Sequence, residues 1–183
     1  MPQEAARLQF GTYPLYSVDA SALIDFKDYY PRDFFPSMWQ LVENLAAQNR
    51  LFICEQVKVE CHDAELRSLV SAYPGMVVDW ASMEEYFRRF QAEAQHNNIL
   101  LTPPGSPTDE ADPYVVALAL MLEQRDLQDL RRRLTPDATC VVVTQEKPAG
   151  PGAKRPRIPN VCEFYGLRCI PWLQFLKNEG YAG

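Results

Sequence analysis

Histidine is too scarce in this sequence, and cysteine too widely spaced, for the commonest hydrolytic and zinc sites. Only His62 and His96 occur among 183 residues, and neither lies in a Ser-His-Asp or Cys-His pattern. The five cysteines occur mostly in apolar stretches, and two pairs of them are seven residues apart. Zinc ligands are usually about two to four residues apart, with further His or Cys ligands nearby. We therefore expect buried free thiols and no zinc site.

The chain also lacks long apolar runs and glycine-rich phosphate motifs. No run of about 20 apolar residues is present, which argues against a membrane-spanning helix. The first residues, MPQEAARLQF, have neither the basic nor the apolar region of a secretory signal, so we expect a cytoplasmic protein with reduced cysteines. The segment GPGAK lacks the spacing and hydroxyl residue of a Walker motif. A dehalogenase-like phosphatase would need Asp-x-Asp after the first strand, and Ser21 occupies the second acidic position.

Charge is distributed unevenly along the chain. The formal net charge is −6, but residues 1–124 carry 8 basic and 18 acidic side chains, whereas residues 125–168 carry 9 basic and 5 acidic ones. A local basic patch can hold phosphates even when the whole chain is acidic. The alternative is a solvated face plus a flexible loop. Most of the positive charge in this segment comes from seven side chains: Arg131, Arg132, Arg133, Lys147, Lys154, Arg155 and Arg157.

Apolar periodicity predicts a single α/β domain over residues 1–183. Strands are expected at residues 13–18, 138–143 and 167–170. Residues 51–53 could be a short strand or the approach to a helix, and residues 75–80 a short strand or a buried linker. Helices are expected after Asp19 and at residues 38–48, 55–70, 82–95, 159–165 and 171–179. The helix at 82–95 would start with a capping box formed by Ser82 and Glu85. The alternation of strands and helices favours a mainly parallel central sheet with helices on both faces. We further expect a loop at 97–110, an insertion around 125–137 with a polar helix at 125–133, and a mobile loop at 148–157.

Four acids occupy positions where folding could bring them together. Asp19 and Glu146 each follow an apolar strand, Asp112 opens an apolar helix, and Glu60 lies within another helix. Ligands of parallel sheets gather at the carboxyl ends of the strands. Clustered carboxylates raise each other's pKa, and shared protons or divalent cations relieve the repulsion. Oxygen ligands without His or Cys suit Mg²⁺ or Mn²⁺. Taken singly, Asp112 could simply be a helix N-cap and Glu60 a helix-surface residue.

The first two of these segments resemble motifs of PIN-domain ribonucleases. LYSVDASALIDF is similar to their first strand, in which an Asp is followed by a small residue and then Ser, Thr or Asn; here these positions are Asp19, Ala20 and Ser21. FICEQVKVEC is similar to their second motif, a helix that carries one Glu, and the matching residue is Glu60.

The third and fourth motifs follow in the same order. DPYVVALAL resembles the third motif, an Asp before an apolar helix rich in small residues, at Asp112. VVVTQE resembles the fourth, a strand that ends in Thr, any residue and an acid, at Thr144 and Glu146. The fourth acid is usually Asp, and the spacing from the third motif is longer than usual. The resemblance covers roughly the whole chain, and the segment from Tyr29 to Trp39 further resembles a little-described bacterial PIN-like branch.

The resemblance implies a three-layer PIN-like fold and a metal-dependent endoribonuclease that leaves a 5′-phosphate and a 3′-hydroxyl. Many bacterial members are toxins of the VapC type, which a cognate antitoxin holds inactive. A homodimer of this chain is a further expectation. DNA cleavage, a phosphatase, or a non-catalytic scaffold that binds RNA or protein are the alternatives. The implied roles are Mg²⁺ or Mn²⁺ ligands at Asp19, Glu60, Asp112 and Glu146, orienting hydroxyls at Ser21 and Thr144, and RNA-backbone contacts from the seven basic residues named above.

Overall fold

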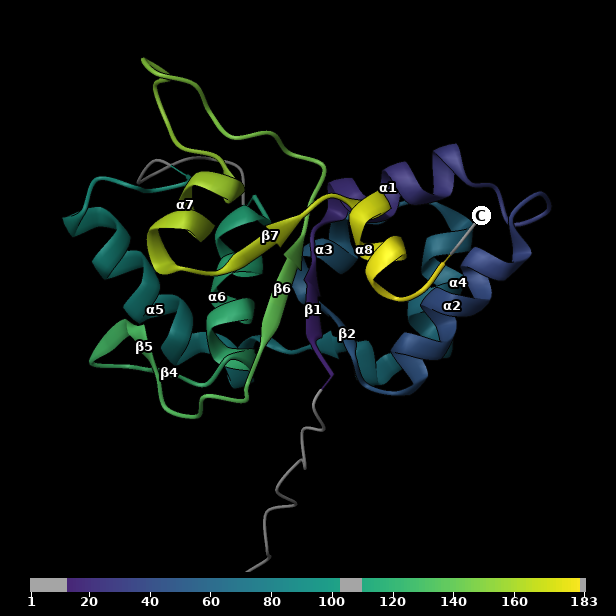
Figure 1. The fold of residues 1–183 in the computed structure, drawn as a ribbon, viewed down its shortest axis with the longest axis horizontal. Coiled ribbons are helices and arrows are strands. Elements are labelled where there is room, and N and C mark those ends of the chain that lie inside the picture. Colours follow the sequence, from purple (N-terminus) through teal and green to yellow (C-terminus); the bar gives the residue numbers. More distant parts are fainter. Residues whose placement is uncertain (1–12, 103–109, 182–183) are drawn as a thin grey trace, which may run out of the picture.

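The centre of the computed structural model, which describes residues 13–102 and 110–181, is a five-stranded parallel sheet (Figure 1). Its strands are β1 (Leu15–Val18), β2 (Leu51–Cys54), β3 (Val77–Val78), β6 (Cys140–Val143) and β7 (Arg168–Ile170). Their order across the sheet is β3-β2-β1-β6-β7, and every pair is parallel. The expected α/β class with a parallel central sheet is confirmed. All residues of β1, β2 and β6 are buried, which explains why these strands are continuous apolar runs.

Helices cover both faces of the sheet, as expected for this class. They are α1 (Ala20–Tyr29), α2 (Pro36–Ala47), α3 (Glu55–Glu60), α4 (Ala64–Ala72), α5 (Trp80–His96), α6 (Asp112–Leu122), α7 (Ile158–Tyr165) and α8 (Trp172–Asn178), with a 3₁₀ turn, η1, at Pro74–Met76. Helices α5, α6 and α7 lie on one side of the sheet, and α1, α2, α4 and α8 lie on the other (Figure 1).

Helix α6 fixes the position of the third acid. It packs on β1, β2 and β6 with one side and on α5 with another, so 8 of its 11 residues are buried. Its sequence is apolar almost all round, as expected of a helix that is enclosed by protein. This packing holds Asp112, the first residue of α6, close to the carboxyl ends of β1 and β6.

The expected polar helix at 125–133 is wrong. These residues form an antiparallel hairpin of β4 (Arg125–Asp126) and β5 (Asp129–Arg133). The backbone N–H of Gln128 donates to the Asp126 carboxylate at 2.8 Å and closes the turn. The guanidinium of Arg125 is buried; it pairs with Glu123 and donates to backbone carbonyls of β5. A helix would not offer those carbonyls to a buried cation, so tertiary contacts decide this segment.

Two other element boundaries also differ from expectation. The single helix expected at 55–70 is two helices, because the chain breaks at Cys61–Asp63 and the Asp63 carboxylate accepts from the N–H groups of Glu65 and Leu66. Helix α5 begins at Trp80, before Ser82, and its cap is Asp79, which accepts from the Ser82 N–H at 2.9 Å. The remaining expected strands and helices are confirmed within one or two residues, and residues 51–54 and 77–78 are strands.

The loops and thiols agree with the sequence where the structure describes them. All five cysteines are free, and four of them are buried. Residues 97–102, Glu110 and residues 144–157 contain no helix or strand; the rest of the expected loop at 97–110 lies outside the described residues. Within the two described ranges, no helix has the length and apolar character needed to cross a membrane.

Candidate functional site

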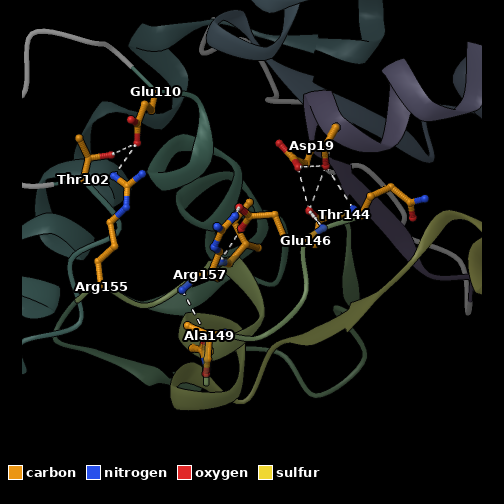
Figure 2. A network of polar contacts seen from close by, with 12 residues as sticks. Asp19, Thr102, Glu110, Thr144, Glu146, Ala149, Arg155 and Arg157 are labelled. Carbon is orange, nitrogen blue, oxygen red and sulfur yellow. Dashed lines mark hydrogen bonds and ion pairs between the residues drawn. The ribbon is translucent and has the colours of Figure 1, made fainter. Parts of the chain in front are cut away.

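Asp19 lies where β1 ends and α1 begins, and two hydroxyl groups hold its carboxylate. The side chain is 3% exposed. Its Oδ2 accepts hydrogen bonds from the Ser21 hydroxyl and from the Thr144 hydroxyl, the latter at 2.8 Å (Figure 2). The Asp19 backbone N–H donates to the Val143 carbonyl at 2.9 Å, which ties this position to the end of β6. Ser21 and Thr144 therefore occupy the orienting positions that the sequence motifs implied.

Burial raises the pKa of Asp19, because desolvation penalises a charged carboxylate. The hydrogen bonds from Ser21 and Thr144 oppose that rise, and the nearby charge of Glu146 adds to it. The two hydroxyls thus stabilise an anion that would otherwise be costly at this depth.

Asp112 lies at the N-terminus of α6 but does not cap it. The N-cap residue is Ala111, and Asp112 is the first residue inside the helix, so the interpretation of Asp112 as a mere N-cap is wrong. Within the described part of the chain, no hydrogen bond holds its carboxylate. Burial, followed by the negative charges of four other acids, raises the pKa of Asp112 to about 7; in order of effect these acids are Glu146, Asp19, Glu110 and Glu60. The other three predicted acids, Asp19, Glu60 and Glu146, therefore lie around the Asp112 carboxyl group, together with Glu110.

Glu60 reaches the same place from the last turn of α3. Its Oε1 accepts a hydrogen bond from the backbone N–H of Ala111 at 3.1 Å, so it caps α6 from another helix. Burial raises the pKa of Glu60, the Ala111 N–H opposes this, and the charges of Asp19 and Glu110 add to it. Glu60 is therefore more than a helix-surface residue.

Glu146 lies at the site but is engaged with protein groups. Its Oε2 accepts from the backbone N–H of Ile158, the first residue of α7, at 3.0 Å, and its Oε1 accepts from Arg157 at 2.8 Å (Figure 2). Its own N–H donates to the Thr144 hydroxyl at 3.1 Å. Both carboxylate oxygens of Glu146 are therefore used in contacts with the start of α7 and the residue before it.

Glu110 is a fifth acid of the site that the sequence reasoning missed. It precedes Asp112 by two residues and accepts from the Thr102 hydroxyl and from Arg155, both at 3.3 Å (Figure 2). Its charge raises the pKa of both Asp112 and Glu60. The available signal was its place immediately before the third motif, but a single acid in a proline-rich loop has no periodicity to single it out.

The five acids have the right donor atoms for a hard divalent cation, but their present arrangement would not hold one. All five candidate ligands are carboxylates, and three of them have raised pKa values because negative charge is crowded and buried. Among the described residues, however, no three acid, thiol or imidazole side chains converge closely enough to hold a metal ion as they stand. Glu60 and Glu146 point their oxygens at helix N–H groups. Metal binding would require these two side chains to turn toward Asp19 and Asp112.

The predicted basic residues fall into two groups. Arg131, Arg132 and Arg133 lie on the β4–β5 hairpin, which Figure 1 shows at the end of the molecule away from the loop after β6. Arg133 contacts Glu123, just beyond the last residue of α6, while Asp112 is the first. At about 1.5 Å per residue, α6 places Glu123, and with it Arg133, about 16 Å along the helix axis from Asp112. The hairpin arginines have local partners: Arg131 lies over the Phe164 ring, and Arg132 pairs with Asp126.

The second basic group borders the acids. Lys147, Lys154, Arg155 and Arg157 line a groove of about 600 Å³ together with Glu146 and Gln145. Four of the seven predicted basic residues therefore lie beside the acids, and the three arginines of the hairpin lie beyond the other end of α6.

Comparison with known proteins gives a family but no activity. A family model described as a domain of unknown function, DUF4411, matches residues 16–127 and 134–182. The chain belongs to the DUF4411 family. All five acids of the site lie within the matched ranges. No curated protein and no solved structure matches the chain.

Proposed function

We propose that this DUF4411 protein is a divalent-metal-dependent endoribonuclease. The observation that carries the proposal is the gathering of acids around the start of α6, where Glu60 accepts from the Ala111 N–H beside Asp112, and where burial and the charges of four surrounding acids raise the pKa of Asp112 to about 7. Such a concentration of carboxylates at the carboxyl edge of a parallel sheet, with only Glu110 and Glu146 paired to arginines among the described residues, is costly for a purely structural role. A bound divalent cation would offset it.

Asp19 and Asp112 are the central ligands in this proposal, and Glu60 and Glu146 complete the set from either side. Ser21 and Thr144 keep the Asp19 carboxylate in one orientation. Bound Mg²⁺ or Mn²⁺ would supply a Lewis acid that lowers the pKa of a bound water and stabilises charge developing on a phosphodiester. The basic groove next to Glu146 supports a phosphate-containing substrate.

The choice of RNA, and the biological role, rest on the resemblance to PIN-domain ribonucleases. On that ground we propose a toxin of the VapC type that acts in the cytoplasm, with an antitoxin protein as its partner. The order of all four motifs along the chain supports this assignment, and the similarity of the segment from Tyr29 to Trp39 to a bacterial branch adds to it.

A non-catalytic scaffold is the second candidate, because one specific observation favours it. Glu60 and Glu146 serve as caps for the N-termini of α6 and α7, and Glu146 also pairs with Arg157. If these contacts are the purpose of the two residues, the acids stabilise the fold and need no metal.

Cleavage of end-labelled RNA with Mn²⁺, Mg²⁺ or EDTA tests the two candidates. The enzyme proposal expects metal-dependent cuts by the wild type, and their loss in Asp19→Asn and in Asp112→Asn. Glu84→Gln is the matched control, because it makes the same acid-to-amide change on α5, away from the site, where Glu84 pairs with the exposed Arg88. DNA of the same sequence is assayed in parallel. If the wild type cuts neither RNA nor DNA and its Tm does not rise on adding Mn²⁺, the scaffold is favoured.

A further inference from the structure

The groove beside Glu146 contains cations in two different states. Among the described residues that line it, Lys147 and Lys154 form no ion pair, whereas Arg155 pairs with Glu110 at 3.3 Å and Arg157 pairs with Glu146 at 2.8 Å. Four cations thus face a single groove, and two of them are bound to carboxylates of the acidic site. The chain as a whole is acidic, with a net charge of −6, so this concentration of cations is local.

The two arginines are held loosely enough to be released. The side chains of Arg155 and Arg157 are 51% and 58% exposed, whereas those of their partners, Glu110 and Glu146, are only 31% and 15% exposed. Ion pairs with one exposed partner are weak, and a guanidinium binds phosphate oxygens as readily as it binds a carboxylate. Each arginine can therefore leave its carboxylate when another anion is offered in the groove.

We propose that the groove formed by Gln145–Lys147 and Lys154–Arg157 binds the phosphate backbone of a single-stranded nucleic acid. Until a phosphate binds, Arg155 and Arg157 stay paired with the Glu110 and Glu146 carboxylates of the acidic site. A phosphate that takes Arg157 leaves Glu146 free, and a cation that takes Glu146 leaves Arg157 free. Polyanion and divalent cation then bind with positive coupling, because each removes the competitor of the other. The inference builds on the proposed nuclease, and it assigns that site its substrate path and its control.

The first test measures RNA binding without metal, so that cleavage cannot interfere. A fluorescein-labelled 12-nucleotide single-stranded RNA is titrated by anisotropy in EDTA at pH 8. Glu146→Gln should tighten binding about fivefold, the factor expected when an exposed ion pair no longer holds a groove cation. Asp112→Asn is the matched control, because it removes a negative charge from the same site without freeing an arginine. If the two variants change RNA affinity equally, Glu146 does not compete with RNA for Arg157. If Lys147→Gln and Lys154→Gln both bind RNA as tightly as the wild type, the groove is not the RNA-binding surface.

The second test measures Mn²⁺ binding without RNA, by calorimetry. Arg157→Gln should lower the Kd for Mn²⁺ about fivefold, since it removes the competitor for Glu146. Lys154→Gln is the control; it removes the same charge from the same loop but breaks no ion pair among the described residues. Equal Kd values in both variants would contradict the competition. No Mn²⁺ binding by any variant would instead overturn the proposed nuclease, while the RNA titration would still decide the groove.

Discussion

Replacement of Asp112 by Asn should stabilise the metal-free protein, and more strongly at alkaline than at acid pH. The pKa of Asp112 is about 7 in the folded protein, against 3.8 ordinarily. The folded state therefore favours the protonated carboxyl, so this group supports folding most below pH 3.8 and loses that contribution as the pH rises to 7 and beyond. Asn has no charge to desolvate and avoids the loss.

The expected magnitude follows from the pKa. Each pH unit between 3.8 and about 7 is worth about 1.4 kcal/mol, which gives about 4 kcal/mol in full. The side chain is partly open to solvent, so we expect about half of that, roughly 2 kcal/mol at pH 8. In a chain of this size that corresponds to a rise in Tm of about 4–8 °C. At pH 5 the gain should be less than half as large, because the folded carboxyl is then mostly protonated.

Thermal melts in EDTA at pH 5 and pH 8 measure this difference. Glu84→Gln, the acid-to-amide change on α5, should change Tm little at either pH, because it removes one ion pair with the exposed Arg88. An Asp112→Asn protein that melts below the wild type at pH 8, or whose gain is the same at both pH values, would refute the electrostatic crowding on which the site rests.

Three further outcomes follow from the contacts of the site and the hairpin. Thr144→Val should cost about 1–3 kcal/mol in urea unfolding, because the buried Asp19 carboxylate loses a donor at 2.8 Å; Ser37→Ala, an exposed hydroxyl deletion, should cost little. Arg125→Met should cost about 3–5 kcal/mol in the same assay, because it leaves the carboxylate of buried Glu123 with only part of its pairing. Mn²⁺ at about 100 times its Kd should stabilise the wild type by about 2.7 kcal/mol, EDTA should reverse this, and Asp19→Asn should abolish it; an unchanged Tm in the wild type would count against a metal site.

The sequence predicted the sheet well because its strands carry their own signal. Residues of β1 and β6 are buried on both faces, so each strand is an apolar run that ends at a polar residue. The β4–β5 hairpin could not be predicted in this way. Its residues are mostly polar, and its conformation depends on the buried guanidinium of Arg125, which pairs with Glu123 and also donates to carbonyls of β5 and to the distant carbonyl of Gly166. Such tertiary contacts have no local pattern in the sequence.

The site was predicted where position along an element determines position in space. Asp19 follows a parallel strand and Asp112 starts the helix that packs on that strand, so both had to lie at one edge of the sheet. Glu110 was missed because its place depends on the path of a loop. The distance of the hairpin arginines from the acids could not be predicted either, because charge counted along a chain does not show which end of α6 it reaches.

Glu146 is the residue on which the two proposed functions differ, because it contacts two local structures at once. It follows β6 by three residues, which brings its charge next to Asp112, yet its oxygens contact Arg157 and the first N–H of α7. A residue with a purely structural role would gain nothing from also raising the pKa of a buried neighbour. A permanent metal ligand, in turn, would gain nothing from an arginine that is more than half exposed. The proposed exchange of this carboxylate between Arg157 and a cation would account for both sets of contacts, with the control of the site in the same loop that lines the groove.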